Sequence, residues 1–311
     1  MPEILIHLPR DMIDAVADNP NQFYRKLEQG LSEAGYAARI LRRRRGNPCP
    51  PADDNFHFVH QGLHRQANVL NTGLAYVFPF WYADPTGIYG HSSLVSARFE
   101  PAALDRDAAQ SFGNRLRARL VAKRFSRYDQ KTAVTPFDGG HVAVFLQGPG
   151  DILERAQLFE TVDLLRAVAR LDRPVVVKPH PAGQTDQETA LLRDLVHAGL
   201  VQQTDANIHD ILSGAVASVS ISSAVTLEGM MHGVPAVLCG LSDLHHNAVT
   251  ARSPDQIGPA IEQAIATPWQ HDAFLYWFLF QQNLNAGAPD LIDRALARIA
   301  ATGADLTSFR R

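Results

Sequence analysis

Residues 218–238 constrain the fold of this chain more than any other stretch. A short apolar run ends at Ser222 and Ser223, a helical stretch follows, and a second apolar run begins after Gly233. Strand, turn, helix and strand in this order are typical of a parallel α/β sheet. The serines stand where a helix N-cap is expected, and the free N–H groups of a helix N-terminus attract phosphate. The pattern fits both an ordinary capped βαβ unit and a nucleotide site, and alone it does not separate them.

Glu228 adds a second reason to consider a nucleotide. It follows Ser222 by six residues, which places its carboxylate within about two turns of the start of the predicted helix. A carboxylate near that end can accept hydrogen bonds from the two neighbouring hydroxyls of a ribose. The hypothesis for the rest of the chain is therefore a site for a nucleotide sugar.

The same rhythm of strand, helix and strand runs through both halves of the chain. Its 311 residues exceed the ~250–300 that a single core usually supports, which predicts two domains. Residues 131–140 are predicted to be a linker, because turn-forming residues cluster at 135–140. We therefore predict an α/β domain at 1–138, a nucleotide-sugar domain at 139–268 and a helical segment at 269–311. Periodicity predicts strands at 3–8, 37–41, 55–60, 74–78, 141–146, 174–177 and 200–203, and helices at 19–34, 98–128, 152–171, 185–199, 208–212, 254–266 and 291–301.

Composition excludes several classes of function. The net charge is -3, with 46% hydrophobic and 20% charged residues, which describes a globular chain and no nucleic-acid binder. Cys49 and Cys239 fit neither a disulfide framework nor a zinc site. The sequence shows no signal peptide and no apolar run of ~18–20 residues. We expect a cytoplasmic protein, with any membrane contact peripheral and at the inner face.

Polar loops follow three predicted strands in the second half. They span residues 147–151, 178–181 and 220–228. Because ligands of open α/β sheets bind beyond the carboxyl ends of the strands, we expect these loops to meet on one rim. Three loops at one rim are stronger evidence for a ligand site than any one of them.

Two of these loops carry side chains suited to catalysis. Lys178 and His180 stand in a Lys-Pro-His-Pro sequence whose prolines stiffen the backbone, and both can neutralise a phosphate or assist its departure. Asp151 begins a predicted helix and fits an N-cap. As a carboxylate beside a sugar it also fits a nucleophile or base.

Three motifs carry a resemblance to a known family: Gln147-x-x-x-Asp151, Lys178-Pro-His-Pro181 and Ser222-Ser223-x-x-Thr226-x-Glu228. They resemble motifs of the capsule polysaccharide biosynthesis family. The Gln-x-x-x-Asp element resembles more narrowly the retaining β-Kdo glycosyltransferases, where Kdo is 3-deoxy-manno-octulosonic acid. The resemblance covers residues 142–240.

The resemblance implies a GT-B fold, in which two Rossmann-like domains face a cleft and the last helix crosses back to the first domain. It implies a transferase of capsule or lipopolysaccharide biosynthesis that takes Kdo or a related acidic sugar from its CMP form, without a metal or other cofactor. Asp151 would be the nucleophile, with Gln147 orienting the sugar and His180 assisting. By the same resemblance, the donor-binding residues are Lys178, His180, Ser222, Ser223, Thr226 and Glu228.

Other interpretations stay open. They are an inverting transferase using a UDP- or CMP-sugar, an epimerase of the GT-B fold, and an inactive nucleotide-binding module. In an inverting enzyme the base would come from the first half, where His60, Asp84 and His91 are candidates. The acceptor is expected to be a glycan or glycolipid, and the aromatic stretch 78–89 and the basic run 42–45 are its predicted surface. The sequence identifies neither the acceptor itself nor the oligomeric state.

Overall fold

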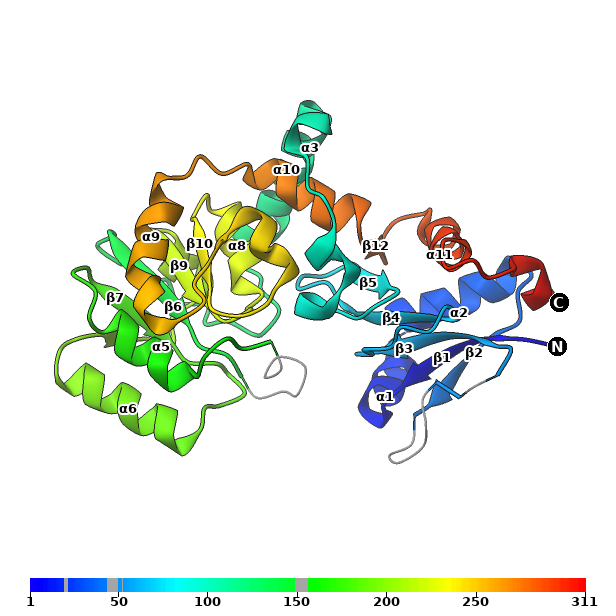
Figure 1. The fold of residues 1–311 in the computed structure, drawn as a ribbon, viewed down its shortest axis with the longest axis horizontal. Helices are drawn as coiled ribbons and strands as arrows, with labels where there is room; N and C mark the ends of the chain where they lie inside the picture. The colour runs from blue at the N-terminus through cyan, green and yellow to red at the C-terminus, as the bar shows by residue number, and fades with distance from the viewer. Residues whose placement is uncertain (20–21, 44–49, 52, 149–155) are drawn as a thin grey trace. The chain divides into compact units, whose positions relative to one another are not determined.

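The computed structural model describes residues 1–311 except 20–21, 44–49, 52 and 149–155. The chain forms two compact units. The first unit combines residues 1–97 with 278–311, and the second is the continuous stretch 98–277 (Figure 1). Among the described helices, none is both long and apolar enough to cross a membrane.

The first unit is built on a six-stranded sheet with the strand order β12-β5-β4-β3-β1-β2. Strands β2, β1, β3 and β4 pair in parallel, whereas β5 pairs antiparallel with β4 and β12 antiparallel with β5. The strands are β1 Ile4–Leu8, β2 Ala38–Arg42, β3 Phe56–His60, β4 Val69–Leu74, β5 Phe80–Asp84 and β12 Leu284–Asn285, and the α-helices are α1 Arg10–Asp18, α2 Phe23–Glu33 and α11 Leu291–Ala300.

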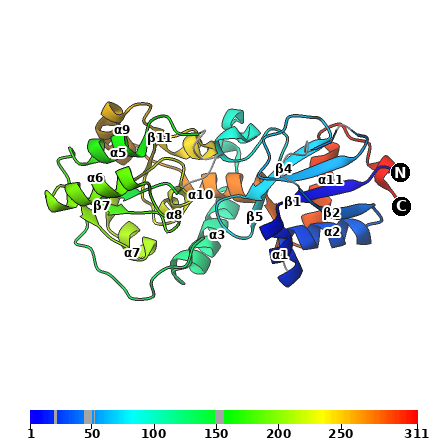
Figure 2. The ribbon, with the colours of Figure 1, turned by 90° about the horizontal axis from the view of Figure 1, so that it is seen from below.

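One face of this sheet carries the main core of the first unit. Ile4, Ile6 and Leu8 of β1 belong to it, because side chains two residues apart point to the same face of a strand. They pack with Leu27 of α2 and Ile299 of α11. Helix α11 comes from the last segment of the chain, and Figure 2 shows it beside α2 and the sheet. That segment is therefore part of the core of the first unit.

The second unit is built on a parallel six-stranded sheet with the order β11-β10-β9-β6-β7-β8. Its strands are β6 His141–Phe145, β7 Val175–Lys178, β8 Gln202–Gln203, β9 Ala215–Ser220, β10 Ala236–Leu238 and β11 Val249–Thr250. Its α-helices include α3 Arg106–Leu116, α5 Thr161–Val168, α6 Asp186–His197, α7 Ile208–Leu212, α8 Val225–Met231, α9 Ile257–Ala266 and α10 His271–Leu275.

Alternate residues of β6 face two separate cores. Val142 and Val144 pack with residues of α5, α6 and α9, whereas Ala143 and Phe145 pack with residues of α7 and with Val234 after α8. A parallel sheet covered by helices on both faces needs strands that are apolar throughout. The Val-Ala-Val-Phe sequence of β6 meets that requirement.

The predicted fold class is confirmed. Both units are Rossmann-like α/β layers with mainly parallel sheets, and the last helix returns to the first unit, as in a GT-B fold. The units divide the chain differently from the predicted boundary at 138, since α3 packs against α10 and both belong to the second unit. The chain passes between the units at residues 97–98 and 277–278.

The predicted strand at 74–78 is wrong. β4 ends at Leu74 and β5 begins at Phe80, and residues 75–79 form the turn between these antiparallel strands. The aromatic stretch 78–89 largely supplies β5 and the core. Trp81 stacks on Phe23 with ring centroids 4.6 Å apart, and both are buried. Phe80, Trp81, Tyr82 and Tyr89 are buried, and Phe78 is exposed at 54%. Most of the stretch therefore packs the unit and does not form the sugar-stacking surface that the sequence suggests.

Two helices are shorter than periodicity predicts. In place of a helix over 98–128, α3 ends at Leu116 and continues into the π-helical turn Arg117–Val121. Asp105 caps α3 by accepting two backbone N–H groups at 2.9 Å, which explains why the helix begins so late. In place of a helix over 152–171, the described residues 156–160 are not helical and α5 begins at Thr161.

Candidate functional site

Three strands of the second unit bring the predicted site residues to one edge of the sheet. β6 lies between β7 and β9, and its last residue, Phe145, pairs with Lys178 on one side and Ser220 on the other. The chain leaves β6 toward β7 and β8 and then returns to β9, so the strand order reverses between β6 and β9. Ligands of open α/β sheets bind beyond the carboxyl ends of the strands at such a point.

Unpaired buried polar atoms gather along this edge. Among the described residues, Gln147 Oε1, Ser222 Oγ and both carboxylate oxygens of Glu228 are buried without a hydrogen-bond partner. The exposed fractions of these residues are 8%, 2% and 0%. An unsatisfied buried polar group costs about 1–3 kcal/mol, so several of them at one edge indicate a ligand that supplies the missing partners.

The loop after β6 lies against the loop after β7. The backbone carbonyl of Gln147 accepts a hydrogen bond from Nε2 of Gln184 at 2.8 Å. Gly148 lies so close to His180 that a Cβ at this position would overlap the imidazole ring. Gln147 and His180 are thus brought together as predicted for one rim, whereas Asp151, the predicted nucleophile, lies outside the described residues.

His180 is a neutral hydrogen-bond donor in this arrangement. Its Nδ1 accepts from the backbone N–H of Ala182 at 3.1 Å, so Nε2 carries the proton of the neutral ring. Burial, and after it the Arg127 cation, lowers the pKa of His180, which keeps the ring neutral at pH 7. The Nε2–H group can therefore donate to an anionic oxygen.

Helix α8 begins later than the sequence predicts, and the predicted N-cap at Ser222 or Ser223 is wrong. The N-cap is Ala224, and Ser223 Oγ accepts from the backbone N–H two residues on at 3.3 Å. Thr226 is buried and shares a hydrogen bond of 3.0 Å with Ser220, which ties the helix to β9. Of these hydroxyls, that of Ser222 is buried without a partner in the described structure.

Glu228 lies in the first turn of α8 and is fully buried. Burial raises the pKa of its carboxyl to about 8, although Ser126, Arg127 and Lys178 each lower it. The Ser126 hydroxyl is near the carboxyl but outside hydrogen-bond geometry, so both oxygens keep their acceptor capacity. A carboxyl with this pKa is mostly protonated at pH 7, and donors that favour its ionised form would release the proton.

The ammonium group of Lys178 is already engaged by the protein. Nζ donates to the backbone carbonyls of Asp205, at 3.3 Å, and Ala206, and to the side-chain carbonyl of Gln130 at 3.2 Å. An ammonium group has three donors, and each has a protein acceptor here. Burial lowers the pKa of Lys178. The arrangement supports a structural role for this lysine and leaves its predicted contact with phosphate without a spare donor.

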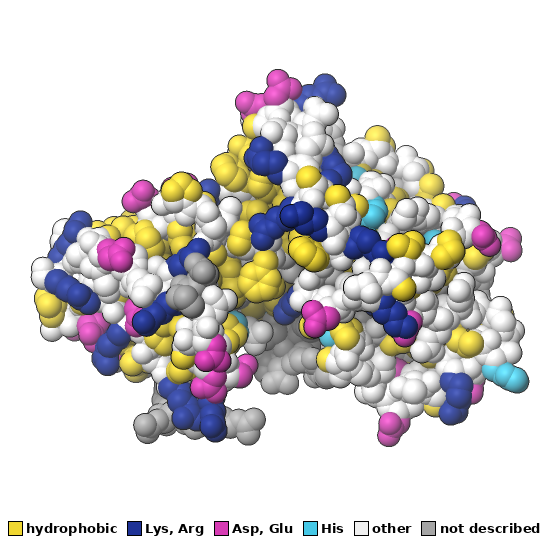
Figure 3. Space-filling view, turned by 180° about the vertical axis from the view of Figure 1, so that it is seen from behind, with side chains coloured by type: hydrophobic (Ala, Val, Ile, Leu, Met, Phe, Trp, Pro, Cys, Tyr) yellow, Lys and Arg dark blue, Asp and Glu magenta, His cyan; other side chains and the backbone are white. Residues whose placement is uncertain are grey.

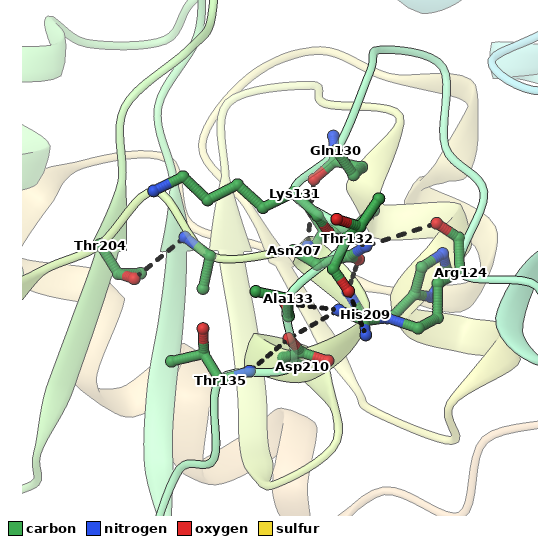
Figure 4. Close-up of polar contacts among 12 residues, drawn as sticks. Arg124, Gln130, Lys131, Thr132, Ala133, Thr135, Thr204, Asn207, His209 and Asp210 are labelled. Atoms are coloured by element: carbon green, nitrogen blue, oxygen red, sulfur yellow. Dashed lines mark hydrogen bonds and ion pairs between the residues drawn. The ribbon is translucent and has the colours of Figure 1, made fainter.

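Residues 124–135, which we call the strap, follow the end of α3 and its π-helical turn and lie on the loop between β8 and α7 (Figure 4). Arg124 donates to two backbone carbonyls later in the strap, at 3.2 Å each, and pairs with Asp210 at 2.8 Å. The side-chain amide of Asn207 donates to two strap carbonyls at 3.4 and 3.1 Å. The sequence predicts a linker at 131–140, but its first residues are anchored here.

Two contacts bracket the middle of the strap. The carbonyl of Phe125 accepts from Nε2 of His209 at 2.8 Å, and the ring of Tyr128 meets His180 edge-on with centroids 5.0 Å apart. Ser126 and Arg127 lie between these contacts, within electrostatic range of Glu228. Sequence reasoning missed both residues, because the helical period of 98–128 conceals the break after Val121.

Asp84, a predicted alternative base in the first unit, is a structural acceptor. Its carboxylate accepts from the backbone N–H and the hydroxyl of both Thr86 and Ser93, and from the backbone N–H of Gly87, at 2.6–3.1 Å. These hydrogen bonds hold the turn after β5. With its lone pairs occupied, the carboxylate is poorly suited to accept a proton from a substrate.

The two predicted histidines of the first unit differ in their surroundings. Nδ1 of His60 shares a hydrogen bond of 2.6 Å with the hydroxyl of Tyr24, which is itself bonded to Thr72 at 2.9 Å. Nε2 of His91 is buried without a hydrogen-bond partner among the described residues. Of the basic run 42–45, residues 44 and 45 lie outside the described residues, and Arg43 donates to the backbone carbonyl of His60 at 3.2 Å.

The first unit also contains a chain of imidazole rings that the sequence did not reveal. Nε2 of His57 lies 2.9 Å from a carboxylate oxygen of Asp53, and Nδ1 of His57 lies 2.9 Å from Nε2 of His7. Because an ionised carboxylate only accepts, His57 donates from Nε2 and accepts at Nδ1, and His7 donates from Nε2. Burial and the neighbouring His57 lower the pKa of His7 to about 4, so this ring is neutral at pH 7.

The described residues contain no group of three or more His, Cys, Asp or Glu side chains placed to hold a metal ion. Lys and Arg side chains gather on and around α3, the projection at the top of Figure 3. Arg115 of α3, Arg119 of the π-helical turn and Lys123 just after it are exposed, at intervals of four residues. These positive side chains form the basic stripe of the second unit.

Two solved structures share this fold over nearly the whole chain. The first is Thermosulfurimonas dismutans KpsC, beta Kdo 2,7 transferase, with a TM-score of 0.56 and 13% identity, covering 98% of this chain and 100% of that chain. The second is Thermosulfurimonas dismutans KpsC, beta Kdo 2,4 transferase, with a TM-score of 0.53 and 14% identity, covering 96% and 98%. No protein-family model and no curated protein matches the chain. At these identities the comparison establishes the fold.

Proposed function

We propose that this protein is a glycosyltransferase of surface polysaccharide synthesis that binds a nucleotide-sugar donor in its second unit. The observation that carries the proposal is the set of unpaired buried polar atoms on Gln147, Ser222 and Glu228 where the strand order reverses. A nucleotide sugar offers matching groups: ribose hydroxyls for a carboxylate, phosphate oxygens for a hydroxyl, and sugar hydroxyls for an amide. The fold shared with two Kdo transferases is consistent with this proposal.

The proposed donor is a CMP-activated acidic sugar, Kdo or a close relative, and the proposed acceptor is a glycan or glycolipid. The three motifs of the second unit support this choice. We propose that no metal or other cofactor takes part, since His180 Nε2–H and the Ser222 hydroxyl can hydrogen-bond the phosphate and Glu228 the ribose. In this assignment Ser223 and Thr226 shape the phosphate loop through their own hydrogen bonds.

The proposed reaction is a double displacement that retains the anomeric configuration. A carboxylate oxygen of Asp151 forms a bond to the anomeric carbon while the bond from that carbon to the phosphate oxygen breaks, and CMP leaves with the electron pair. The acceptor oxygen then bonds to the same carbon, its proton passes to a base, and the carboxylate of Asp151 is released. Gln147 orients the sugar through its unpaired amide oxygen.

A panel of nucleotides tests the donor class. Thermal unfolding of the full-length protein should shift upward with CMP at concentrations well above its dissociation constant, because a ligand at about 100 times that constant adds ~2.7 kcal/mol to stability. Ser222→Ala and Glu228→Gln should reduce the shift, whereas the exposed control His197→Gln should preserve it. A shift with UDP or UMP in place of CMP would favour the UDP-sugar transferase or epimerase. The absence of any shift would refute a nucleotide site.

Mass spectrometry tests the proposed chemistry. After incubation with CMP-Kdo, the intact protein should gain the mass of one Kdo residue on Asp151, and Asp151→Ala should show neither the adduct nor transfer. Product with inverted anomeric configuration would refute the double displacement, but the proposed transferase activity would still stand. Nucleotide binding with no transfer to any tested glycan would favour the inactive binding module.

We further propose a cytoplasmic location with peripheral contact at the inner face of the membrane. The basic stripe of Arg115, Arg119 and Lys123 supports this, since each basic residue near an anionic bilayer contributes about 1 kcal/mol. The protein should sediment with vesicles containing phosphatidylserine and not with phosphatidylcholine vesicles. Changing the three residues to Glu should abolish sedimentation, and equal binding of the variant would contradict the assignment.

A further inference from the structure

The strap supplies a cation that the motifs do not contain. It passes from the His209 side chain, which holds the carbonyl of Phe125, to His180, which the ring of Tyr128 touches. Farther along, Gln130 accepts hydrogen bonds from Lys178 Nζ and from the backbone N–H of Ile208, both at 3.2 Å. Residues 126 and 127 are therefore held at the carboxyl edge of the sheet from both sides.

Arg127 is the charged residue in this held segment. Its guanidinium lies 5.5 Å from the centre of the Tyr128 ring, and Tyr128 touches His180. The Arg127 charge affects the pKa of both Glu228 and His180. It lowers the pKa of the Glu228 carboxyl, against the effect of burial, and it lowers the pKa of the His180 imidazole, in the same direction as burial. Arg127 is half-buried, and its charge reaches both Glu228 and His180. A guanidinium can bind a phosphate with two parallel hydrogen bonds.

Lys178 is the residue to which the motif assigns this charge, but the protein already engages its ammonium group. Its three donors have protein acceptors from Gln130, Asp205 and Ala206. A phosphate could recruit Nζ only by breaking one of these hydrogen bonds. Lys178 therefore holds the strap and the loop between β8 and α7 together.

We propose that Arg127, and not Lys178, supplies the positive charge that neutralises the phosphate of the nucleotide-sugar donor. The inference rests on the proposed function, because it assumes that a nucleotide binds at this edge. It adds a donor-binding residue from outside the three motifs. It also assigns Lys178 to positioning, since Lys178 fixes the strap through Gln130 and the loop through Asp205 and Ala206.

Calorimetry with paired ligands tests the assignment. CMP and cytidine differ only in the phosphate, so the ratio of their affinities isolates the phosphate contact. In the full-length protein, Arg127→Gln should weaken CMP about 10- to 100-fold and leave cytidine unchanged, because the variant loses a charge-assisted contact. Arg127→Lys should give an intermediate loss, since it keeps the charge and loses the planar fork. If the nucleotide panel selects uracil, UMP and uridine replace this pair.

Two further variants make the test specific. Lys178→Gln should lower the melting temperature and weaken CMP and cytidine equally, because its effect passes through the strap. The control Arg193→Gln, at an exposed arginine of α6, should change neither ligand. A selective loss of CMP in Lys178→Gln, or an unchanged CMP-to-cytidine ratio in Arg127→Gln, would overturn the inference and leave the nucleotide site standing. A wild-type protein that binds no nucleotide would remove the proposed function itself, and the inference with it.

Discussion

The Nζ atom of Lys178 donates a hydrogen bond to the side-chain carbonyl of Gln130 at 3.2 Å. The same oxygen accepts from the backbone N–H of Ile208, also at 3.2 Å. One amide oxygen therefore connects the end of β7, the strap and the start of α7. The contact makes the strap part of the sheet edge, although 48 residues of chain separate Gln130 from Lys178.

We predict that Gln130→Ala destabilises the second unit. The substitution removes an acceptor from the half-buried Lys178 ammonium and from a backbone N–H, and an unsatisfied donor costs about 1–3 kcal/mol. Urea unfolding should show this loss, with Gln110→Ala, an exposed glutamine on α3, as the control. Equal unfolding free energies for the two variants would show that the strap is not anchored through this oxygen.

Glu228 predicts a pH dependence of stability. Burial raises the pKa of its carboxyl from 4.5 to about 8, so the folded protein keeps a proton that the unfolded chain releases above pH 4.5. The free energy of unfolding should therefore fall as pH rises through the window from 4.5 to about 8. In Glu228→Gln, which cannot ionise, this part of the pH dependence should vanish. Parallel pH profiles for wild type and variant would contradict the raised pKa.

The same carboxyl predicts a proton release when the nucleotide binds. Ribose hydroxyls donate to the ionised form, so binding at pH 7 should displace the proton. The measured binding enthalpy should then depend on the ionisation enthalpy of the buffer, and CMP affinity should rise with pH up to about 8. Buffer-independent enthalpies would indicate that the ribose does not meet Glu228.

Gly148 predicts a steric test of the His180 position. A Cβ at residue 148 would overlap the His180 ring, which must then move and lose its hydrogen bond from Ala182. Gly148→Ala should weaken CMP binding, and pairing it with His180→Ala should give less than the sum of the separate losses, since the two share one contact. Gly258→Ala is the matched control, because its Cβ would meet Leu171 at an ordinary 3.7 Å.

The ring chain of the first unit predicts a tautomer pattern. With Asp53 as the anchoring acceptor, His57 and His7 should both carry their proton on Nε2 at pH 7. Nitrogen-15 NMR of the full-length protein distinguishes the two tautomers. His7 should remain neutral down to a pH of about 4, its pKa, because burial and His57 disfavour its charged form. A proton on Nδ1 of His7 would refute the chain as assigned.

Sequence patterns predicted the features that depend on neighbouring residues, namely the strands of the second unit and the loops that follow them. The strands around Phe145, Lys178 and Ser220 read as apolar runs, and the rule for ligands of parallel sheets then placed their loops at one edge. The rim of the second unit follows from these two steps. The positions of Gln147, His180 and Glu228 relative to the strand ends needed no further information.

What the sequence left out depends on contacts between distant residues. The strap is held by Asp210 and Asn207, more than 70 residues away, and no local period reports such hydrogen bonds. Helix α8 begins only at Val225, and Thr226 in its first turn bonds to Ser220 of β9, a contact that the helical pattern does not report. The aromatic content of β5 fits both a packed core and a sugar-stacking surface, so the sequence does not separate these two roles.

The discontinuity of the first unit has a consequence for synthesis on the ribosome. The second unit is a single stretch of chain, so all of it is synthesised before residue 278. The first unit cannot complete its fold until the last segment of the chain has been made, because β12 pairs with β5, and α11 contributes Leu291, Ala295 and Ile299 to the core. Until those residues emerge, an edge of β5 and an apolar face remain uncovered, the features that make a nascent chain dependent on chaperones. The first unit therefore begins at the start of the chain but completes its fold only after the second unit has been synthesised.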